Sequence, residues 1–231
     1  GGSRSRSRSA DEPTAKRARK LTAADLGAPI EDEETARQKL ADAGFDPDNL
    51  TMQVENVSPP DGEGSWDATP MTQFCGAGDL KMVRYLVSKG VATVKADDDD
   101  DDDENCSPMR AAILMGQTAV CEWLFEHGAA AEVRYAASIK GGRNLLRNSL
   151  SAWRAGRGSN ASQWLVRNGA LTRPDGIPDE NAIKAIASYE GATSDFRNLL
   201  VWAKESFKVN SNIHLILLGS LLPRGNILLP L

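Results

Sequence analysis

The chain is 231 residues long, which suits one elongated domain, and its formal net charge is −5. The negative charge and the lack of a basic stripe on the body argue against a protein that binds nucleic acid through its folded part. Its three cysteines lack paired spacing for zinc and no secretory signal precedes them, so we expect a reducing intracellular compartment, nuclear or cytoplasmic.

Residues 1–30 are predicted to form a disordered basic tail, because residues 1–20 have no aromatic side chain and, apart from proline, no aliphatic one larger than alanine. Seven basic residues against two acidic ones give residues 1–20 a net charge of +5. Arg4 to Ser9 form a short Arg-Ser tract similar to those of splicing-related proteins, and phosphorylation of its serines would reverse its charge. A basic cluster that resembles a nuclear localisation signal follows: Lys16, Arg17, Arg19 and Lys20. A plain basic tail without such a role is the alternative.

Two features lie between the tail and the first regular unit. Residues 32–43 are predicted to form a helix that ends at Gly44, either as half of a repeat or as an N-terminal cap. The cluster Ser58-Pro59-Pro60-Asp61-Gly62 predicts a turn that interrupts regular structure.

One pattern occurs twice and predicts two helix-turn-helix units. Offsets of 9, 17 and 21 residues from a Thr or Ser recur in Thr69-Pro70-Met71, Gly78, Leu86, Gly90 and in Ser107-Pro108-Met109, Gly116, Leu124, Gly128. Thr69 and Ser107 are expected to cap the first helix of each unit, because proline fits the first helical turn. Gly90 and Gly128 are expected to end the second helix in the left-handed conformation. Such a unit cannot bury its apolar face alone, so the units must stack.

A third, degenerate copy follows the two regular ones. Counting back 21 residues from Gly169 places its start at Asn148, with Leu150 in the position of Met71, but Trp153 stands where a small residue is expected. Further helices are predicted at 179–189 and 194–207. Residues 211–231 are predicted to form an apolar C-terminal capping segment, because the run 213–222 has 10 residues and a bilayer span needs about 20.

The regular units resemble ankyrin repeats, whose Thr-Pro-Leu-His opening is similar to Thr69-Pro70-Met71-Thr72 and Ser107-Pro108-Met109-Arg110. The resemblance implies an all-α fold, an ankyrin-repeat solenoid of stacked helix-turn-helix units with long inter-repeat loops over residues 31–210. The closing glycines lie 38 and 41 residues apart, whereas the family period is 33. The additional residues are therefore expected in the loops between units, which often belong to the binding face.

One of these loops carries an acidic run of eight residues, Asp97 to Glu104. Since like charges repel, the simplest prediction is a solvated loop; the alternatives are an electrostatic site for a basic partner and a contact with the chain's own basic tail. A calcium site is disfavoured, because a homopolymer lacks ligands at defined intervals around a glycine turn. A second charged group is predicted to be a solvated surface, a docking face for an acidic partner or an internal site for the acidic run: Arg143, Arg147, Arg154, Arg157, Arg167 and Arg173.

Catalytic chemistry is not indicated by the sequence. The only histidines are His127 and His214, and no nucleophile elbow, phosphate loop or dinucleotide motif is present. His127 precedes a closing glycine, where a structural role is expected. We therefore expect no enzyme, cofactor, metal or small-molecule substrate.

The resemblance implies a non-enzymatic scaffold or adaptor that binds another protein, with a basic partner surface as one possibility. In ankyrin repeats, loop tips and first helices line the partner surface. The contact candidates on that basis are Trp66, Asp67, Thr72, Gln73, Asp97, Asp100, Asp103, Asn105, Arg110 and Leu114. The alternative function is a regulatory or targeting subunit of a nuclear RNA-processing or enzyme complex, recruited through the Arg-Ser tail. Nucleic acid is expected to bind only through that tail, and no membrane span is expected.

Overall fold

The computed structural model describes residues 26–27, 29–59, 66–94, 107–134, 145–157, 159–171, 194–195, 197–199 and 201–202. The predictions for the basic tail through residue 25, the acidic run, Asn105, the helix at 179–189 and the segment 211–231 lie outside these residues. None of the helices in the described ranges has both the length and the apolar character needed to cross a membrane.

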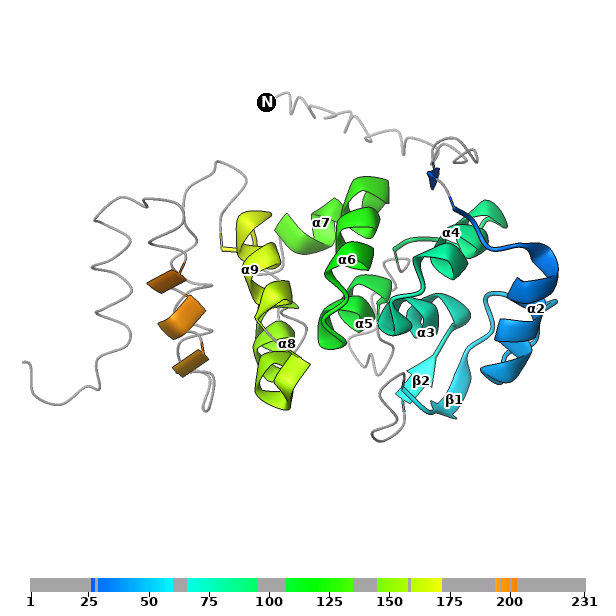
Figure 1. Ribbon diagram of the computed structural model, residues 1–231, viewed down its shortest axis with the longest axis horizontal. Helices are drawn as coiled ribbons and strands as arrows, with labels where there is room; N and C mark the ends of the chain where they lie inside the picture. Colours follow the sequence, from blue (N-terminus) through cyan, green and yellow to red (C-terminus); the bar gives the residue numbers. More distant parts are fainter. Residues whose placement is uncertain are drawn as a thin grey trace, which may run out of the picture.

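Helices lie side by side in a row along the long axis of the molecule (Figure 1). The elements in chain order are α2 (Glu33–Asp42), β1 (Val54–Val57), β2 (Trp66–Ala68), α3 (Pro70–Ala77), α4 (Leu80–Ser88), α5 (Pro108–Leu114), α6 (Thr118–Leu124), η1 (Phe125–Ala129), α7 (Ala130–Arg134), α8 (Leu145–Ala152), η2 (Trp153–Arg157) and α9 (Asn160–Arg167). Three units repeat along this row: α3–α4, α5–α6 and α8–α9. Their first helices α3, α5 and α8 pack against one another in one layer, and their second helices lie on the other side of it.

The caps predicted for the first two units are confirmed. The Thr69 side chain accepts a hydrogen bond from the Thr72 backbone, and the Ser107 side chain accepts one from the Arg110 backbone. A proline opens each of these helices. Gly90 and Gly128 have φ values of 95° and 123°, the left-handed region that favours glycine, so each ends its unit as the sequence predicted.

The core runs through the whole row as a series of contacts between units. At the same position of each second helix, Leu86, Leu124 and Leu165 are 0% exposed. The small residues Ala111 and Ala112 of α5 are also fully buried, which lets α5 approach its neighbours closely. Each unit therefore buries its apolar face mainly against the next, as expected of a repeat fold.

A two-stranded antiparallel sheet adds to the predicted helical architecture. Strands β1 and β2 pair Val54 with Ala68 and Val57 with Trp66, so three steps along β1 oppose two along β2. The extra residue forms a bulge in which Asn56 has a φ of 56°, a conformation that asparagine tolerates better than most residues. The sequence reasoning predicted a turn after this point and did not predict the strands on either side of it.

The third unit starts earlier than the glycine spacing predicted. Asn148 is not a cap but lies inside α8, which already includes Leu145, and Leu150 is fully buried as expected. The helix continues into the wider turn η2, where Gly156 adopts a φ of 81°. The spacing rule fails because the connection between α8 and α9 is longer than the matching connections of the first two units.

The packed part of the chain also begins before the predicted boundary at residue 30. Leu26 is only 1% exposed and belongs to the core, and Ile30 packs against it. Residues 26–31 lie across the second helices, on the side away from the hairpin β1–β2 (Figure 1). Leu26 and Ile30, which the sequence reasoning placed at the end of the tail, thus pack against the repeats.

Candidate interaction site

The residues predicted to contact a partner in the first unit gather beside the hairpin β1–β2. Trp66 and Asp67 lie on β2, and Gln73 lies in the first turns of α3, which packs against β2. The Trp66 indole Nε1 donates to Gln73 Oε1 at 2.9 Å, and Gln73 Nε2 donates to the Ser58 carbonyl at 3.1 Å. The Gln73 side chain thus connects the half-buried Trp66 at the start of β2 to Ser58 just after the end of β1.

Asp67 has a part in holding the bulge. Its Oδ1 accepts a hydrogen bond of 3.0 Å from the backbone N–H of Asn56, the residue with positive φ at the bulge. A carboxylate accepts backbone N–H groups strongly, so this contact rigidifies the hairpin and helps to orient its neighbour Trp66.

A groove of about 200 Å³ adjoins these residues. Its walls come from the hairpin, the start of α3, the segment before β1 and the chain that follows α4. Its lining consists of the apolar Leu50, Met71, Val91, Ala92, Val94 and Pro108 and the polar Thr51, Gln53, Asp67, Thr69 and Thr72, with most of the exposed lining apolar. The groove thus joins the first unit to Pro108 at the start of the second. Together, Trp66, Asp67, Gln73 and this groove are termed the hairpin site below.

Thr72 lines the floor of the groove but is only 4% exposed. Its Oγ1 accepts from the Thr69 backbone N–H at 2.8 Å, while the Thr69 hydroxyl accepts from the Thr72 backbone. This reciprocal capping box uses the hydroxyl to close the start of α3. Thr72 therefore supports the site from below, and we leave it out of the contact surface proposed below.

The predicted contacts of the second unit do not join the hairpin site. Arg110 and Leu114 lie on α5 and are partly exposed. The carbonyl of Leu114 accepts a 3.0 Å hydrogen bond from Arg157 Nη1, which completes the end of α5. Arg157, predicted to be part of an arginine surface, thereby connects the second unit to the third.

The close approach of the third unit to the second is also evident at Gly116. A Cβ at this position, where φ is 72°, would lie 3.0 Å from the backbone oxygen of Arg157. The glycine is thus required both by its conformation and by the close approach of the next unit.

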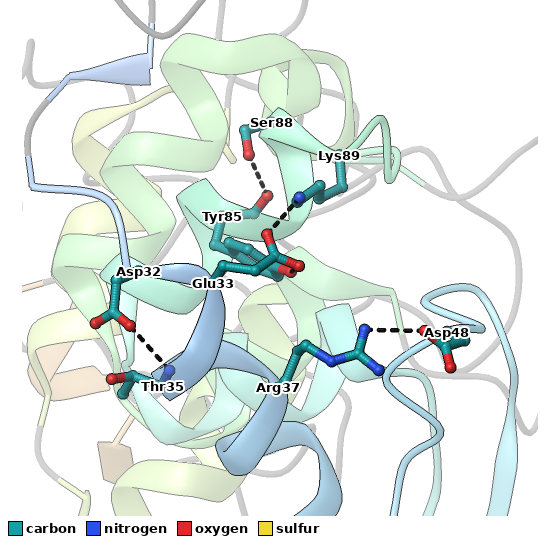
Figure 2. A network of polar contacts seen from close by, with 8 residues as sticks. All are labelled: Asp32, Glu33, Thr35, Arg37, Asp48, Tyr85, Ser88 and Lys89. Carbon is teal, nitrogen blue, oxygen red and sulfur yellow. Dashed lines mark hydrogen bonds and ion pairs between the residues drawn. The ribbon is translucent and has the colours of Figure 1, made fainter.

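Charged residues gather at a second place, where α2 meets α4 (Figure 2). Glu33 accepts a hydrogen bond from the Tyr85 hydroxyl at 3.0 Å and pairs with Lys89. The hydrogen bonds from Lys89 and then Tyr85 lower the pKa of Glu33 below its ordinary value. Arg37 pairs with Asp48 at 2.9 Å, and this bond lowers the pKa of the Asp48 carboxyl.

A neighbouring ion-pair group joins the same two elements. Burial disfavours the charged form of Lys39, but hydrogen bonds to Asp79 and Glu31 outweigh it and raise the pKa of the lysine. Because these charges satisfy one another between α2 and α4, the region attaches the N-terminal helix to the first unit. The sequence reasoning did not identify this contact, since its partners lie up to 56 residues apart.

Residue types that bind metal ions do not cluster in the described ranges. No group of three or more His, Cys, Asp or Glu side chains is placed to hold a metal ion in that part of the chain. The His127 ring stacks on Trp123 with centroids 4.1 Å apart, and its Nδ1 lies 2.7 Å from the Trp123 carbonyl. Its contacts are those of a residue that shapes the end of α6.

Comparison with protein families matches residues 34–135 to ankyrin repeats in three copies. The match covers α2 through α7 and ends before α8, so the third unit lies beyond it. No curated protein and no solved structure shows significant similarity to the chain. The helical repeat architecture predicted from the twin Thr/Ser-Pro-Met pattern is thereby confirmed over these residues.

Proposed function

We propose that this ankyrin-repeat chain is a non-enzymatic adaptor that binds a partner protein at the hairpin site. Ankyrin repeats generally mediate contacts between proteins, and residues 34–135 are such repeats. The observation that supports this particular location is the apolar groove lined by Asp67, next to Trp66 on β2, whose indole is held by Gln73. Tryptophan is enriched among residues that dominate binding energy, and an anchored side chain loses little entropy on binding.

The partner segment that fits this site is a short peptide or loop with one or two apolar side chains. The groove offers mainly apolar walls of modest volume, while Gln53 and Asp67 supply polar groups near it. An apolar side chain would enter the groove, and Trp66, the neighbour of the lining residue Asp67, would offer a further contact on the hairpin. Arg110 and Leu114 on α5 are proposed as a secondary contact for a partner that extends along the first helices.

A basic partner surface is the second element of this proposal. Residues 95–106 lie between Val94 and Ser107 and outside the ranges that the structure describes. Val94 before them and Pro108 just after them both line the groove. The intervening residues include the acidic run, with Asp97, Asp100 and Asp103, and Asn105. Their charge would accelerate the approach of a basic partner and make binding sensitive to salt.

Photocrosslinking tests the location. Benzoylphenylalanine at position 66 should capture a partner from cell extract, and excess unmodified protein should compete it away. The matched control carries the same group at Val201, which is 52% exposed and is not part of the hairpin site. Equal capture of the same protein from both positions would contradict binding at the hairpin site.

Substitution of Trp66 measures how much this side chain contributes to the affinity for the partner. Once a partner is captured, Trp66→Ala should weaken its binding by about thirtyfold, the effect of a residue that contributes roughly 2 kcal/mol. Replacement of Asp97, Asp100 and Asp103 by Asn should weaken binding at low salt and flatten its salt dependence. A partner whose affinity is unchanged by Trp66→Ala binds elsewhere.

Nuclear import is a separate proposal that depends on the basic cluster Lys16, Arg17, Arg19 and Lys20. A fluorescent fusion of the chain should move from nucleus to cytoplasm when all four are changed to Ala. The same fusion with Arg4, Arg6 and Arg8 changed instead distinguishes this cluster from the Arg-Ser tract. The alternative recruitment through the Arg-Ser tract predicts the opposite outcome.

A further inference from the structure

The segment Leu26–Glu31 crosses the second helices of two different units before the chain enters α2. The backbone of Glu31 donates to the carbonyl of Lys81 on α4 at 3.4 Å. Nearer the N-terminus, Pro29 contacts Arg84 of the same helix, and Leu26 reaches Trp123 on α6. The segment therefore spans the junction between the first and second units, on the side away from the hairpin (Figure 1).

Side chains of the helices donate hydrogen bonds to backbone carbonyls of this segment. Trp123 Nε1 donates to the Leu26 carbonyl at 3.1 Å in a buried bond that joins residues 97 positions apart. Arg84 Nη1 donates to the Pro29 carbonyl at 3.2 Å. Recognition of an extended peptide commonly combines backbone hydrogen bonds, which supply affinity, with side-chain pockets, which supply specificity.

One apolar side chain anchors the segment. Leu26 is 1% exposed, and Ile30 packs partly against the same core. Trp123, which binds the Leu26 carbonyl, is itself only 5% exposed, and its ring is held in place by the stacked His127. Between the two apolar residues, Gly27 takes a φ of 72°, a turn that a side chain would oppose.

We propose that Lys81, Arg84 and Trp123 form a peptide-binding strip, which the chain fills with its own segment Leu26–Glu31. The strip takes a leucine followed by a glycine in the left-handed conformation, which Leu26 and Gly27 provide at the start of the sequence Leu-Gly-Ala-Pro-Ile of residues 26–30. This docking fixes the point from which the basic N-terminal residues leave the repeats. That point lies on the second-helix side, away from the hairpin site (Figure 1).

The strip is a site in its own right because its donors come from two units and its occupant from a third part of the chain. Covalent attachment keeps the local concentration of the segment high, so few contacts suffice to hold it. A free peptide of the same sequence pays the full cost of association and should bind only weakly. This proposal does not depend on the partner proposed for the hairpin site.

Fluorine NMR of the full chain with 5-fluorotryptophan provides a direct test. The chain has five tryptophans, and the variant Trp123→Phe identifies the signal of Trp123 by its disappearance. In Leu26→Asp, a charge cannot remain at a site that is 1% exposed, so the segment should undock and the Trp123 signal should shift toward that of a solvated indole. Val201→Asp, at an exposed position, is the control and should leave the Trp123 signal unchanged.

The second arm asks whether the strip binds a peptide. An acetylated peptide with the sequence of residues 26–31, added at millimolar concentration to the Leu26→Asp chain, should restore the Trp123 signal. The same peptide with Asp in place of Leu should not. A Trp123 signal that is insensitive to Leu26→Asp, or one that the first peptide fails to restore, overturns the proposal.

A milder variant provides a test if circular dichroism shows that Leu26→Asp is unfolded. Trp123→Phe keeps an aromatic ring in the core and removes the donor to Leu26 together with part of the indole ring. Hydrogen exchange of the Glu31 amide, which is bonded to Lys81, should then accelerate roughly five- to tenfold, as expected from the loss of one hydrogen bond. Exchange at the wild-type rate would show that Trp123 does not hold the segment, which also overturns the proposal.

Discussion

The first two units and the third bury matching positions of their helices with side chains of different chemistry. The second helices of all three carry a fully buried leucine at one matching position, Leu86, Leu124 or Leu165. Three residues earlier the sequences diverge: Val83 and Cys121 are apolar, but the third unit has Ser162. Ser162 is 0% exposed and its hydroxyl lies 2.8 Å from that of the equally buried Ser149 on α8. A hydrogen-bonded pair thus replaces an apolar contact between first and second helix.

The units also differ in how their first helices start and end. Pro70 and Pro108 follow a capping Thr or Ser and are succeeded by short helices of 8 and 7 residues. In the third unit α8 runs on into η2, and the following helix begins only at Asn160. A repeat can therefore lose its opening motif and still stack, provided that its buried positions stay filled.

The largest effects should come from the leucine that all three units share. We expect Leu86→Ala, Leu124→Ala and Leu165→Ala each to lower the free energy of unfolding by about 2–5 kcal/mol, because each leaves a cavity at a fully buried position. Urea unfolding followed by circular dichroism measures this, with Val201→Ala as the exposed control within about 0.5 kcal/mol. A much smaller loss for Leu165→Ala alone would show that the third unit is not packed like the others.

The cysteine of the second unit provides a pH-dependent comparison with the valine of the first. Burial raises the pKa of the Cys121 thiol to about 12 from an ordinary value of 9.0. Between these values the unfolded chain releases this proton and the native chain retains it. Stability should therefore fall with rising pH across this window, by about 1.4 kcal/mol per pH unit from this group.

Cys121→Val, which copies the first unit, should remove that contribution. Urea titrations of both proteins at several pH values between 8 and 11 isolate it, because the other titrating groups cancel in the difference. Parallel pH profiles for the two proteins would mean that Cys121 is solvated in the native chain.

Particular residues show which features of the fold could be predicted from the sequence and which could not. Thr69, Ser107, Gly90 and Gly128 were predictable because caps and left-handed turns depend on local chemistry. The strands were missed because β1 has only four residues and its bulge breaks the alternation of inward and outward side chains. Leu26 was assigned to the tail because nothing local distinguishes it, and its partner Trp123 is 97 residues away.

The candidate site was partly predictable for the same reason. Trp66, Asp67 and Gln73 were selected by their position in the repeat, and they share the hairpin site because they are close in sequence. The groove beside them depends on Leu50, Val91 and Pro108, whose meeting requires three separate segments to fold together. Thr72 was selected by position too, but its use in the capping box could be seen only with the neighbouring atoms in place.

The serine pair gives the next largest contrast between the units. In Ser149→Ala, the Ser162 hydroxyl loses its 2.8 Å partner in a fully buried position, which should cost about 1–3 kcal/mol. Because replacing both partners by apolar groups removes the need for the bond, the double variant Ser149→Ala/Ser162→Ala should be less destabilised than Ser149→Ala alone. A double-mutant cycle measured by urea unfolding tests this, and additive effects of the two changes would contradict a direct pair.

The smallest expected effects distinguish Thr69, which caps a helix, from Asn148, which only occupies the corresponding position in the glycine spacing. Thr69→Ala should cost about 1 kcal/mol, because it removes the acceptor for the Thr72 N–H, while Thr69→Ser should retain most of the stability. Asn148 occupies the corresponding position by glycine spacing, yet it lies inside α8, and its Nδ2 has no hydrogen-bond partner among the described residues. Since alanine is also the better helix former, Asn148→Ala should be neutral or stabilise the chain by a few tenths of a kcal/mol. Urea midpoints of the three variants decide between the two starts of the third unit, because a loss near 1 kcal/mol for Asn148→Ala would restore it as a cap.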